Sequence, residues 1–414
     1  MKKWAVGVVG GGPAGIMAAI TAARQGAEVT LFERNDRIGK KLLATGNGKC
    51  NLGNQNLTEK EYYGSSAEWI MGCLEQFQTQ DTIQFFQGLG LLIKNKNGYL
   101  YPACEQAAVV LDVLRIELNG LNVLVKTGCK INKIGRNPEN GQLTLGAGEE
   151  TFSFDRVVLA CGSKAAPKTG SDGSGYKLAA QLKHRLVPAV PALVQLKCRE
   201  DYLKAVAGVR TDALVSVLQG EKTIASERGE LQLTDYGISG IPVFQLSRIV
   251  NYLLREQKEV EVSIDLLPDY SGAAYESLQA GRRLLQQGRT VEEYFTGMLH
   301  KKLMMLFIKL AGLKPGSLAE QAQETDIKQV YALCREWRLH VTGSNPYENA
   351  QVCAGGVDTA EVTEEMESRR MPGVYFAGEI LDVDGKCGGY NLQWAWCSGF
   401  LAGRAAGREK YDKN

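Results

Sequence analysis

The chain has 414 residues, a formal net charge of +2 and 44% hydrophobic residues. This length suffices for two or three domains with hydrophobic cores, and the composition is that of an ordinary globular protein without a membrane span. The near-neutral charge gives no reason to expect a nucleic-acid partner. The ten cysteines include no C-x-x-C pair, so no metal site or dithiol motif is expected, and scattered thiols favour a reducing, cytoplasmic compartment.

The first part of the chain has the pattern of a dinucleotide-binding strand–helix–strand unit. A short apolar run over residues 6–9 leads into Gly10, Gly12 and Gly15, which have the G-x-G-x-x-G spacing. These glycines permit a tight turn, a close approach to a pyrophosphate and tight helix packing, while the following helix directs its N–H groups at the phosphates. A second apolar run ends at Glu33, where a carboxylate would meet the ribose hydroxyls. Glu33 would repel a 2′-phosphate, so the pattern predicts FAD or NAD.

Two further glycine-rich segments have the character of ligand-binding loops. The segment 39–51 is basic, and its lysines, among them Lys41 and Lys49, could neutralise a pyrophosphate. The segment 384–391 precedes a helix of small and aromatic residues, whose free N–H groups would stabilise a developing negative charge. A third such loop, 168–176, has no role assigned by its pattern.

The chain between these segments changes character twice. Prolines bracket a boundary near residue 190, after which short strands and turns give way to a largely helical stretch. We therefore expect a discontinuous first domain that is interrupted by an insertion. The expected divisions are 1–190 for the first segment, 191–340 for the insertion (β-rich over 192–268 and helical over 271–339), and 341–414 for the second segment.

Several motifs resemble one family of flavoproteins. Residues 39–51, G-K-K-L-L-A-T-G-N-G-K-C-N, are similar to the G-K-K-x-x-x-[ST]-G-x-G-[RK]-C-N loop of the HI0933-like flavoproteins, which include the YhiN and BaiN types and are often labelled aminoacetone oxidase-like. Residues 229–240, 354–357 and 377–393 resemble its other signatures, in order along the chain. The resemblance implies an α/β fold: a discontinuous, glutathione-reductase-like FAD-binding Rossmann domain with an inserted β-barrel-like plus helical domain.

The resemblance also implies a set of FAD-binding residues. The glycine turn and Glu33 would hold the ADP half, and Ile131 would meet the adenine through its backbone. The basic loop would line the pyrophosphate and flavin side, Glu379 would lie by the ribityl chain, and residues from Gly389 onward would face the flavin pyrimidine edge. The full set is Gly10, Gly12, Ala14, Gly15, Glu33, Arg34, Lys41, Gly46, Asn47, Cys50, Asn51, Ile131, Ala160, Gly162, Gly378, Glu379, Gly389, Tyr390, Asn391 and Gln393.

Two segments depart from the family pattern. Residues 160–163, A-C-G-S, stand where A-T-G-G is common, and residues 99–102, Y-L-Y-P, replace a G-R-x-F-P type segment on the expected substrate side. The thiols of Cys50, Cys353 and Cys387 fall in motifs near the expected flavin, where packing is a more frequent role than redox chemistry. Tyr390 and His340 are candidate proton donors, but no catalytic residue is assigned.

These observations predict an FAD-dependent oxidoreductase. The resemblance implies NAD(P)H-linked reduction of an enone-like or other small organic substrate, with steroid-like or bile-acid-like molecules among the possible substrates. No second glycine triplet of the dinucleotide type follows, so NADH or NADPH would bind transiently at the flavin. Two alternatives stay open: a flavin amine oxidase that uses oxygen, and a tRNA-modifying flavoprotein. The sequence leaves the oligomeric state undetermined.

Overall fold

The computed structural model describes residues 3–408, which divide into two compact units. The first unit combines the chain up to Pro191 with the chain from Tyr347 onward, and the second unit runs from Ala192 to Pro346. The second boundary lies later than the expected position 340, because that position falls inside a strand, β18 (Trp337–Ser344). This strand returns from the helical part of the insertion to close its sheet, so it belongs to the second unit.

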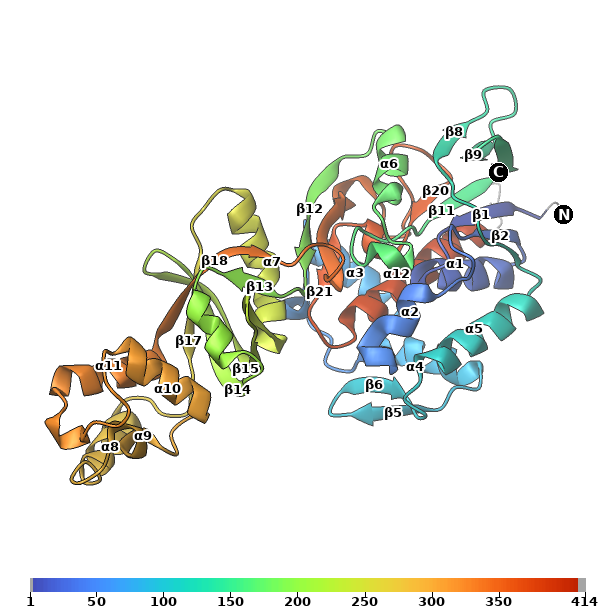
Figure 1. The fold of residues 1–414 in the computed structure, drawn as a ribbon. Coiled ribbons are helices and arrows are strands. Elements are labelled where there is room, and N and C mark those ends of the chain that lie inside the picture. Colours follow the sequence, from blue (N-terminus) through green and yellow to red (C-terminus); the bar gives the residue numbers. More distant parts are fainter. Residues whose placement is uncertain (1–2, 409–414) are drawn as a thin grey trace. The chain divides into compact units, whose positions relative to one another are not determined.

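A five-stranded parallel sheet forms the centre of the first unit (Figure 1). Its strand order is β20-β11-β1-β2-β7, and every neighbouring pair is parallel. The outer strand β20 comes from the second chain segment, so both segments build one sheet. The strands are β1 (Ala5–Val9), β2 (Glu28–Phe32), β7 (Leu124–Lys126), β11 (Arg156–Leu159) and β20 (Val374–Phe376).

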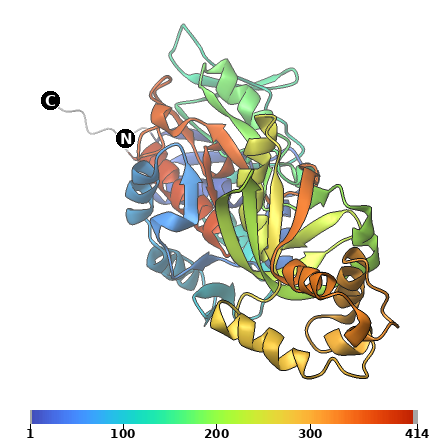
Figure 2. The same ribbon diagram turned by 90° about the vertical axis from the view of Figure 1, so that its left-hand side faces the viewer.

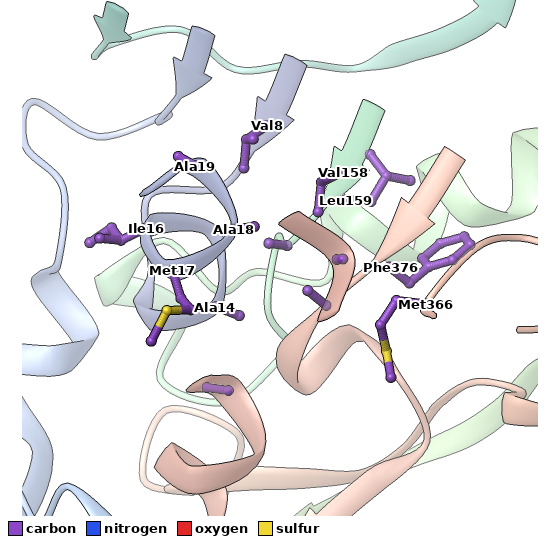
Figure 3. Packing of buried hydrophobic residues seen from close by; sticks show 14 of the residues in the cluster. Val8, Ala14, Ile16, Met17, Ala18, Ala19, Val158, Leu159, Met366 and Phe376 are labelled. Atoms are coloured by element: carbon purple, nitrogen blue, oxygen red, sulfur yellow. The ribbon is translucent and has the colours of Figure 1, made fainter. Parts of the chain in front are cut away.

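The first unit has its core between this sheet and helix α1 (Pro13–Arg24). Fully buried side chains of α1 lie next to those of the neighbouring strand β1, as Figure 3 shows for Val8, whereas Phe376 of β20 lies beside Met366. The central strand β1 is apolar throughout, and its neighbours β2 and β11 are mostly apolar, because both faces of the sheet are covered here. This packing fixes the carboxyl ends of β1 and β2 beside the start of α1.

Helix α12 (Tyr390–Gly407) packs along α1 through small residues. A Cβ atom on Gly399 would lie 2.4 Å from the carbonyl oxygen of Ala14, and one on Gly403 would lie 2.4 Å from that of Ala18. The two helix backbones therefore touch at these glycines. This contact positions the N-terminus of α12 in the same unit as the glycine turn.

The remaining elements of the first unit surround this core (Figure 1). Residues 67–88 form two helices because the chain turns at residues 76–78 and a capping box starts the second helix. The helices are α2 (Lys40–Ala44), α3 (Ala67–Glu75), α4 (Thr79–Gly88), α5 (Ala107–Gly120) and α6 (Ser174–Gln181). Two small sheets have three strands each: one has the order β3 (Gly53–Asn54), β6 (Tyr99–Pro102), β5 (Ile93–Lys96), and the other has the order β10 (Glu150–Phe154), β9 (Leu143–Ala147), β8 (Lys133–Arg136). Two further sheets have two strands each: β12 (Leu186–Ala192) pairs with β19 (Val352–Val357), and β21 (Val383–Gly385) pairs with β4 (Tyr62–Gly64).

The second unit is a closed six-stranded barrel with one helix beside its strands and the others grouped at one end (Figures 1 and 2). The barrel order is β13-β16-β15-β14-β17-β18, and the unit has its own buried core, which includes Trp337. The other strands are β13 (Leu196–Cys198), β14 (Arg210–Gln219), β15 (Lys222–Leu233), β16 (Gly237–Gly240) and β17 (Glu261–Asp265). The helices are α7 (Ile241–Arg255), α8 (Ala273–Arg283), α9 (Val291–Phe295), α10 (Lys301–Leu310) and α11 (Glu324–Arg335). Within residues 3–408, no helix has the length and apolar character needed to span a bilayer.

Candidate functional site

The glycine turn between β1 and α1 leaves one side open to a ligand. Gly10 has φ +112°, and a Cβ there would lie 2.3 Å from the carbonyl oxygen of Ala160. A Cβ on Gly15 would lie 1.8 Å from the carbonyl oxygen of Gly10, so the helix can approach the strand only with glycine here. Over the described residues, no atom comes within 4 Å of the Cβ position of Gly12, and no side chain caps α1. The helix N-terminus is thus free to bind an anion.

The carboxylate of Glu33 orders the loop at the end of β2. Its Oε2 accepts a hydrogen bond from the backbone N–H of Gly11 (2.9 Å), and its Oε1 accepts one from the N–H of Asn35 (2.8 Å). The N–H of Cys129 donates to the carbonyl of Glu33 (2.9 Å). This bond brings the segment that contains the buried Ile131 to the same edge of the sheet. The residues expected at the ADP half therefore lie together.

The glycine-rich loop 168–176, which had no assigned role, closes over this edge. The amide of Asn35 donates to the carbonyl of Thr169 (3.0 Å), and a Cβ on Gly170 would lie 2.5 Å from that amide. Arg34 forms an ion pair with Asp172, which also pairs with Lys130 at 3.2 Å.

Asp172 is held ionised within this loop. Burial of this carboxyl opposes ionisation, but hydrogen bonds from Ser174 and Arg34 hold its pKa well below the usual range. The sequence analysis did not identify Asp172. The available signal was a glycine-rich loop that contains a single acidic residue.

A charged pair joins the basic loop to the second chain segment. The Nζ of Lys41 lies 2.6 Å from Oε2 of Glu379, and the hydroxyl of Ser163 donates to the same oxygen (3.0 Å). A Cβ on Gly378 would lie 2.7 Å from the Cβ of Ala14, so this pair sits beside the start of α1.

Ser163 was not among the expected residues. Its signal was the departure at residues 160–163, where serine stands in place of glycine. Gly162 just before it has φ +69°, and a Cβ there would lie 2.7 Å from the hydroxyl of Ser171. This tight turn aims the Ser163 side chain at Glu379.

The start of α12 meets the end of the basic loop. Gly389 has φ +96°, and a Cβ there would lie 2.7 Å from both Oδ1 of Asn51 and the backbone of Gly53. Oδ1 of Asn51 is buried and accepts no hydrogen bond from any residue of 3–408. The side chain of Asn391 closes the preceding turn, since its Oδ1 accepts from the N–H of Gly385 (2.9 Å) and its amide donates to the carbonyl there (2.7 Å).

The polar side-chain groups of Tyr390 and Gln393 form hydrogen bonds within the protein. The hydroxyl of Tyr390 donates to the carbonyl of Asn56 (3.0 Å). The fully buried amide of Gln393 donates to the carbonyl of Phe77 (3.3 Å), and its Oε1 accepts from the hydroxyl of Thr82 (2.9 Å). What α12 offers a ligand is therefore its backbone N–H groups, because no side chain in the described chain caps this helix.

The thiols near this region are protonated at neutral pH. Cys50 is fully buried, and burial raises its pKa to about 12. Burial likewise raises the pKa of Cys353, and it raises that of Cys387 to about 11. Gly46 and Asn47, just before Cys50, are exposed and adopt left-handed backbone conformations. The conformation of the loop is therefore set by these backbone torsion angles.

His340, a candidate proton donor, lies in the second unit on the barrel strand β18. Its Nδ1 is 2.9 Å from Oε1 of Glu200, and its Nε2 is 2.8 Å from Oε1 of Glu261. Both ring nitrogens are thus occupied by carboxylates on the barrel surface. The contacts assign His340 to an ion-pair network of that barrel.

Comparisons with known proteins identify the family. The family model of the HI0933-like protein Rossmann domain matches residues 4–405, so the chain belongs to this family. A 3-dehydro-bile acid delta(4,6)-reductase of Clostridium scindens is 43% identical over 97% of this chain and 98% of its own length. A ribosomal RNA dihydrouridine synthase of Haemophilus influenzae is 29% identical, again over 97% of this chain and 98% of its own. Among solved structures, a 3-ketosteroid delta1-dehydrogenase from Sterolibacterium denitrificans matches with a TM-score of 0.51 and 12% identity, covering 98% of this chain and 100% of that one.

The family membership confirms the predicted FAD-binding Rossmann fold and the class of the protein. The chain is an FAD-dependent oxidoreductase of the HI0933-like family. The solved structure supports the same fold and nothing beyond it, since its sequence identity is low. The residues also fit the cofactor: α1 presents an uncapped N-terminus, Gly12 is open on one side, and the buried Oδ1 of Asn51 lacks a hydrogen-bond donor within residues 3–408.

Proposed function

We propose that this protein uses FAD to saturate a carbon–carbon double bond conjugated to a carbonyl, with NADH or NADPH as the electron donor. The observation that carries the proposal is the 43% identity, over nearly the whole chain, to a reductase named for the delta(4,6) bonds of a 3-dehydro-bile acid. An enone of this kind accepts a hydride at its β-carbon and a proton at its α-carbon. A steroid-like or bile-acid-like enone is the proposed substrate class, and the free thiols favour a reducing compartment such as the cytoplasm.

The residues that would hold FAD form a continuous path through the first unit. The glycine turn and the N-terminus of α1 would bind the pyrophosphate, and Glu33 with Ile131 would border the adenosine. Lys41 and Glu379 would lie along the middle of the cofactor, and the loop around Asn51 would border the flavin. When bound, FAD supplies the hydride chemistry, which no amino-acid side chain provides.

The protein's own contribution is the placement of charges and of a protonated group. The N-terminus of α12 points free N–H groups and a partial positive charge at the region beside Asn51 and Gly389, where they would stabilise negative charge during the reaction. The ion pair between Lys41 and Glu379 is four-fifths buried, so it holds the basic loop against the second chain segment. The protonated thiol of Cys387 is a group that can donate but not accept a proton at neutral pH.

Anaerobic stopped-flow measurements on the purified flavoprotein test this proposal. We expect NADH or NADPH to bleach the oxidised flavin band, and a 3-keto-Δ4 or 3-keto-Δ4,6 steroid to restore it. The fully saturated 3-keto steroid is the matched control and should leave the flavin reduced. Bleaching by amines such as aminoacetone, with reoxidation by oxygen and no response to either nicotinamide, would instead support an amine oxidase and contradict the reductase proposal.

Uridine in RNA is a second candidate substrate. The observation in its favour is the 29% identity over nearly the whole chain to a ribosomal RNA dihydrouridine synthase. The C5=C6 bond of uracil is conjugated to the C4 carbonyl, so its reduction adds a hydride and a proton in the same way as that of an enone. Formation of dihydrouridine in RNA from a strain that lacks this modification, after incubation with the protein and NADPH, would establish this substrate. Unmodified RNA under conditions that reduce steroid enones would exclude it.

A further inference from the structure

Three lysines converge on one carboxylate in the first unit. The Nζ of Lys49 lies 3.0 Å from Oε2 of Glu105, and the Nζ atoms of Lys94 and Lys96 both contact Oε1, the latter at 2.5 Å. One negative charge cannot neutralise three positive ones, so the cluster has a net charge of +2. The ammonium groups are about a third to a half exposed, and they repel one another at this spacing.

The cluster has a defined scaffold. Lys94 and Lys96 alternate along β5, which places both on one face of the β5–β6 hairpin. Glu105 adopts a left-handed backbone conformation (φ +54°), and its N–H donates to the carbonyl of Pro102 at the end of that hairpin (2.9 Å). This backbone position is unfavourable for a residue other than glycine, and it holds the carboxylate between the lysines.

Two tyrosines of β6 connect the cluster to the candidate flavin region. The ring of Tyr101 lies 5.8 Å from the Nζ of Lys96 and borders Gly46 of the basic loop. The ring of Tyr99 is 41% exposed and would lie 2.9 Å from a Cβ on Gly388, next to the start of α12. Positive charges with an exposed aromatic ring beside them form a recurrent surface for single-stranded nucleic acids. Tyr99 and Tyr101 belong to the segment 99–102, which departs from the family pattern.

We propose that Lys49, Lys94 and Lys96 bind the phosphates of a single-stranded nucleic acid and that Tyr99 stacks on one of its bases. This proposal rests on the second candidate function, reduction of uridine in RNA, since it places a base next to the start of α12, where the flavin would act. A phosphodiester chain suits this surface because it brings several negative charges to a cluster with a net charge of +2. A small acid with one carboxylate would neutralise only one of the two net positive charges of the cluster.

Salt-dependent binding tests the surface. Fluorescein-labelled 20-nucleotide single strands, one of RNA and one of DNA, are titrated with the FAD-loaded protein by fluorescence anisotropy between 50 and 200 mM salt. Removing one lysine–phosphate ion pair should lower the slope of log Kd against log salt by about 0.7, so K94Q/K96Q should lower it by about 1.4. The control is K133Q/K177Q, two exposed lysines on β8 and α6, which lie at the opposite edge of this unit from β5 and β6 (Figure 1). The control should leave the slope unchanged.

Tyr99 variants test stacking. Tyr99→Ala should weaken binding about 5- to 100-fold, whereas Tyr99→Phe should retain the wild-type affinity, because a phenyl ring still stacks. Binding of either strand with these variant effects supports the proposal. Failure of the wild type to bind either strand at 100 μM protein and 50 mM salt, or equal effects of the two lysine pairs, would overturn it.

A further arm separates this proposal from the proposed function. K94Q/K96Q should reduce a neutral steroid enone at the wild-type rate, since neither lysine borders the start of α12. A higher KM for a carboxylate-bearing enone but not for its methyl ester, without any effect on strand binding, would assign the surface to a small acid and overturn the nucleic-acid proposal. If the wild-type protein does not reduce the enone, the proposed function is contradicted. The anisotropy titrations would still test the nucleic-acid proposal independently.

Discussion

Glu379 receives two hydrogen-bond donors at one oxygen, and this arrangement should decide how firmly the cofactor is held. Lys41→Met leaves the largely buried carboxylate with Ser163 alone and removes a positive charge from the middle of the site. Losing a charged partner of a buried group costs about 2–3 kcal/mol, so we expect FAD to bind roughly 30- to 150-fold more weakly. Titration of the apoprotein with FAD, followed by flavin fluorescence quenching, measures this change.

The neighbouring lysine provides the control. Lys40 pairs with the exposed Asp36 at 2.6 Å, so Lys40→Met should change the FAD affinity by less than threefold. Equal weakening by the two substitutions would show that the basic loop acts through its total charge and that the pair with Glu379 has no special part.

His184 should give the stability of the first unit a pH dependence. Burial lowers its pKa, although its Nδ1 lies 3.0 Å from Glu361, and its Nε2 lies 2.7 Å from the hydroxyl of Ser368. That hydroxyl accepts from two backbone N–H groups and so presents its proton to Nε2. The folded state therefore keeps His184 neutral, while the unfolded chain takes up a proton near pH 6.5. The free energy of unfolding should fall as the pH drops below that value.

The His184→Gln variant isolates this effect. Urea unfolding at pH 8.0, 7.0, 6.0 and 5.5 should show a shallower decrease of the midpoint in the variant than in the wild type. The range stops above pH 5 because Glu361, whose pKa lies at about 2 in the fold, also begins to contribute below its ordinary value. Parallel pH profiles in the two proteins would contradict the assignment of the titration to His184.

At the scale of single residues, the sequence predicted the positions that backbone geometry dictates. Gly10, Gly15 and Glu33 could be found because the turn has a fixed spacing and each residue has a distinct physical task. Ser163 and Asp172 lie in segments with a local signal, but that signal indicates no role, because their importance comes from partners more than a hundred residues away. Neither spacing nor composition encodes such long-range pairs.

At the scale of elements, the contact between α1 and α12 depends on glycine. A methyl group at Gly399 would meet a backbone oxygen at 2.4 Å, which cannot move without shifting α1. Gly399→Ala should destabilise the first unit by about 1–3 kcal/mol and weaken FAD binding, because α1 carries the glycine turn. Gly281 in the last turn of α8 is the control, since its Cβ position has no described atom within 4 Å. Gly281→Ala should stabilise its helix by up to about 1 kcal/mol.

Element boundaries were predicted best where a local signal exists. The hairpin around Asn97 and Gly98 has such a signal, because both residues favour the positive φ angles that the turn adopts. The break at residues 76–78 has a weaker one, the capping box of Gln78 and Asp81, because apolar residues continue at helical spacing on both sides of it. The expected boundary at residue 340 divides the last barrel strand, β18, because its partners β13 and β17 precede it by many residues and leave no local signal at its end.

At the scale of the whole molecule, two units with separate hydrophobic cores should respond separately to the cofactor. All residues proposed to hold FAD lie in the first unit, so FAD should stabilise that unit alone. At a free FAD concentration of 100 times Kd, linkage adds about 2.7 kcal/mol, which corresponds to an increase in melting temperature of roughly 5–10 °C. Calorimetry of the apoprotein and the FAD-loaded protein should therefore show one transition that moves and one that does not. Gly281→Ala identifies the second transition, because it lies in the inserted unit and should raise only the melting temperature that FAD leaves unchanged. A single transition that moves as a whole with FAD would show instead that the two cores unfold cooperatively, so that cofactor binding in one unit also stabilises the other.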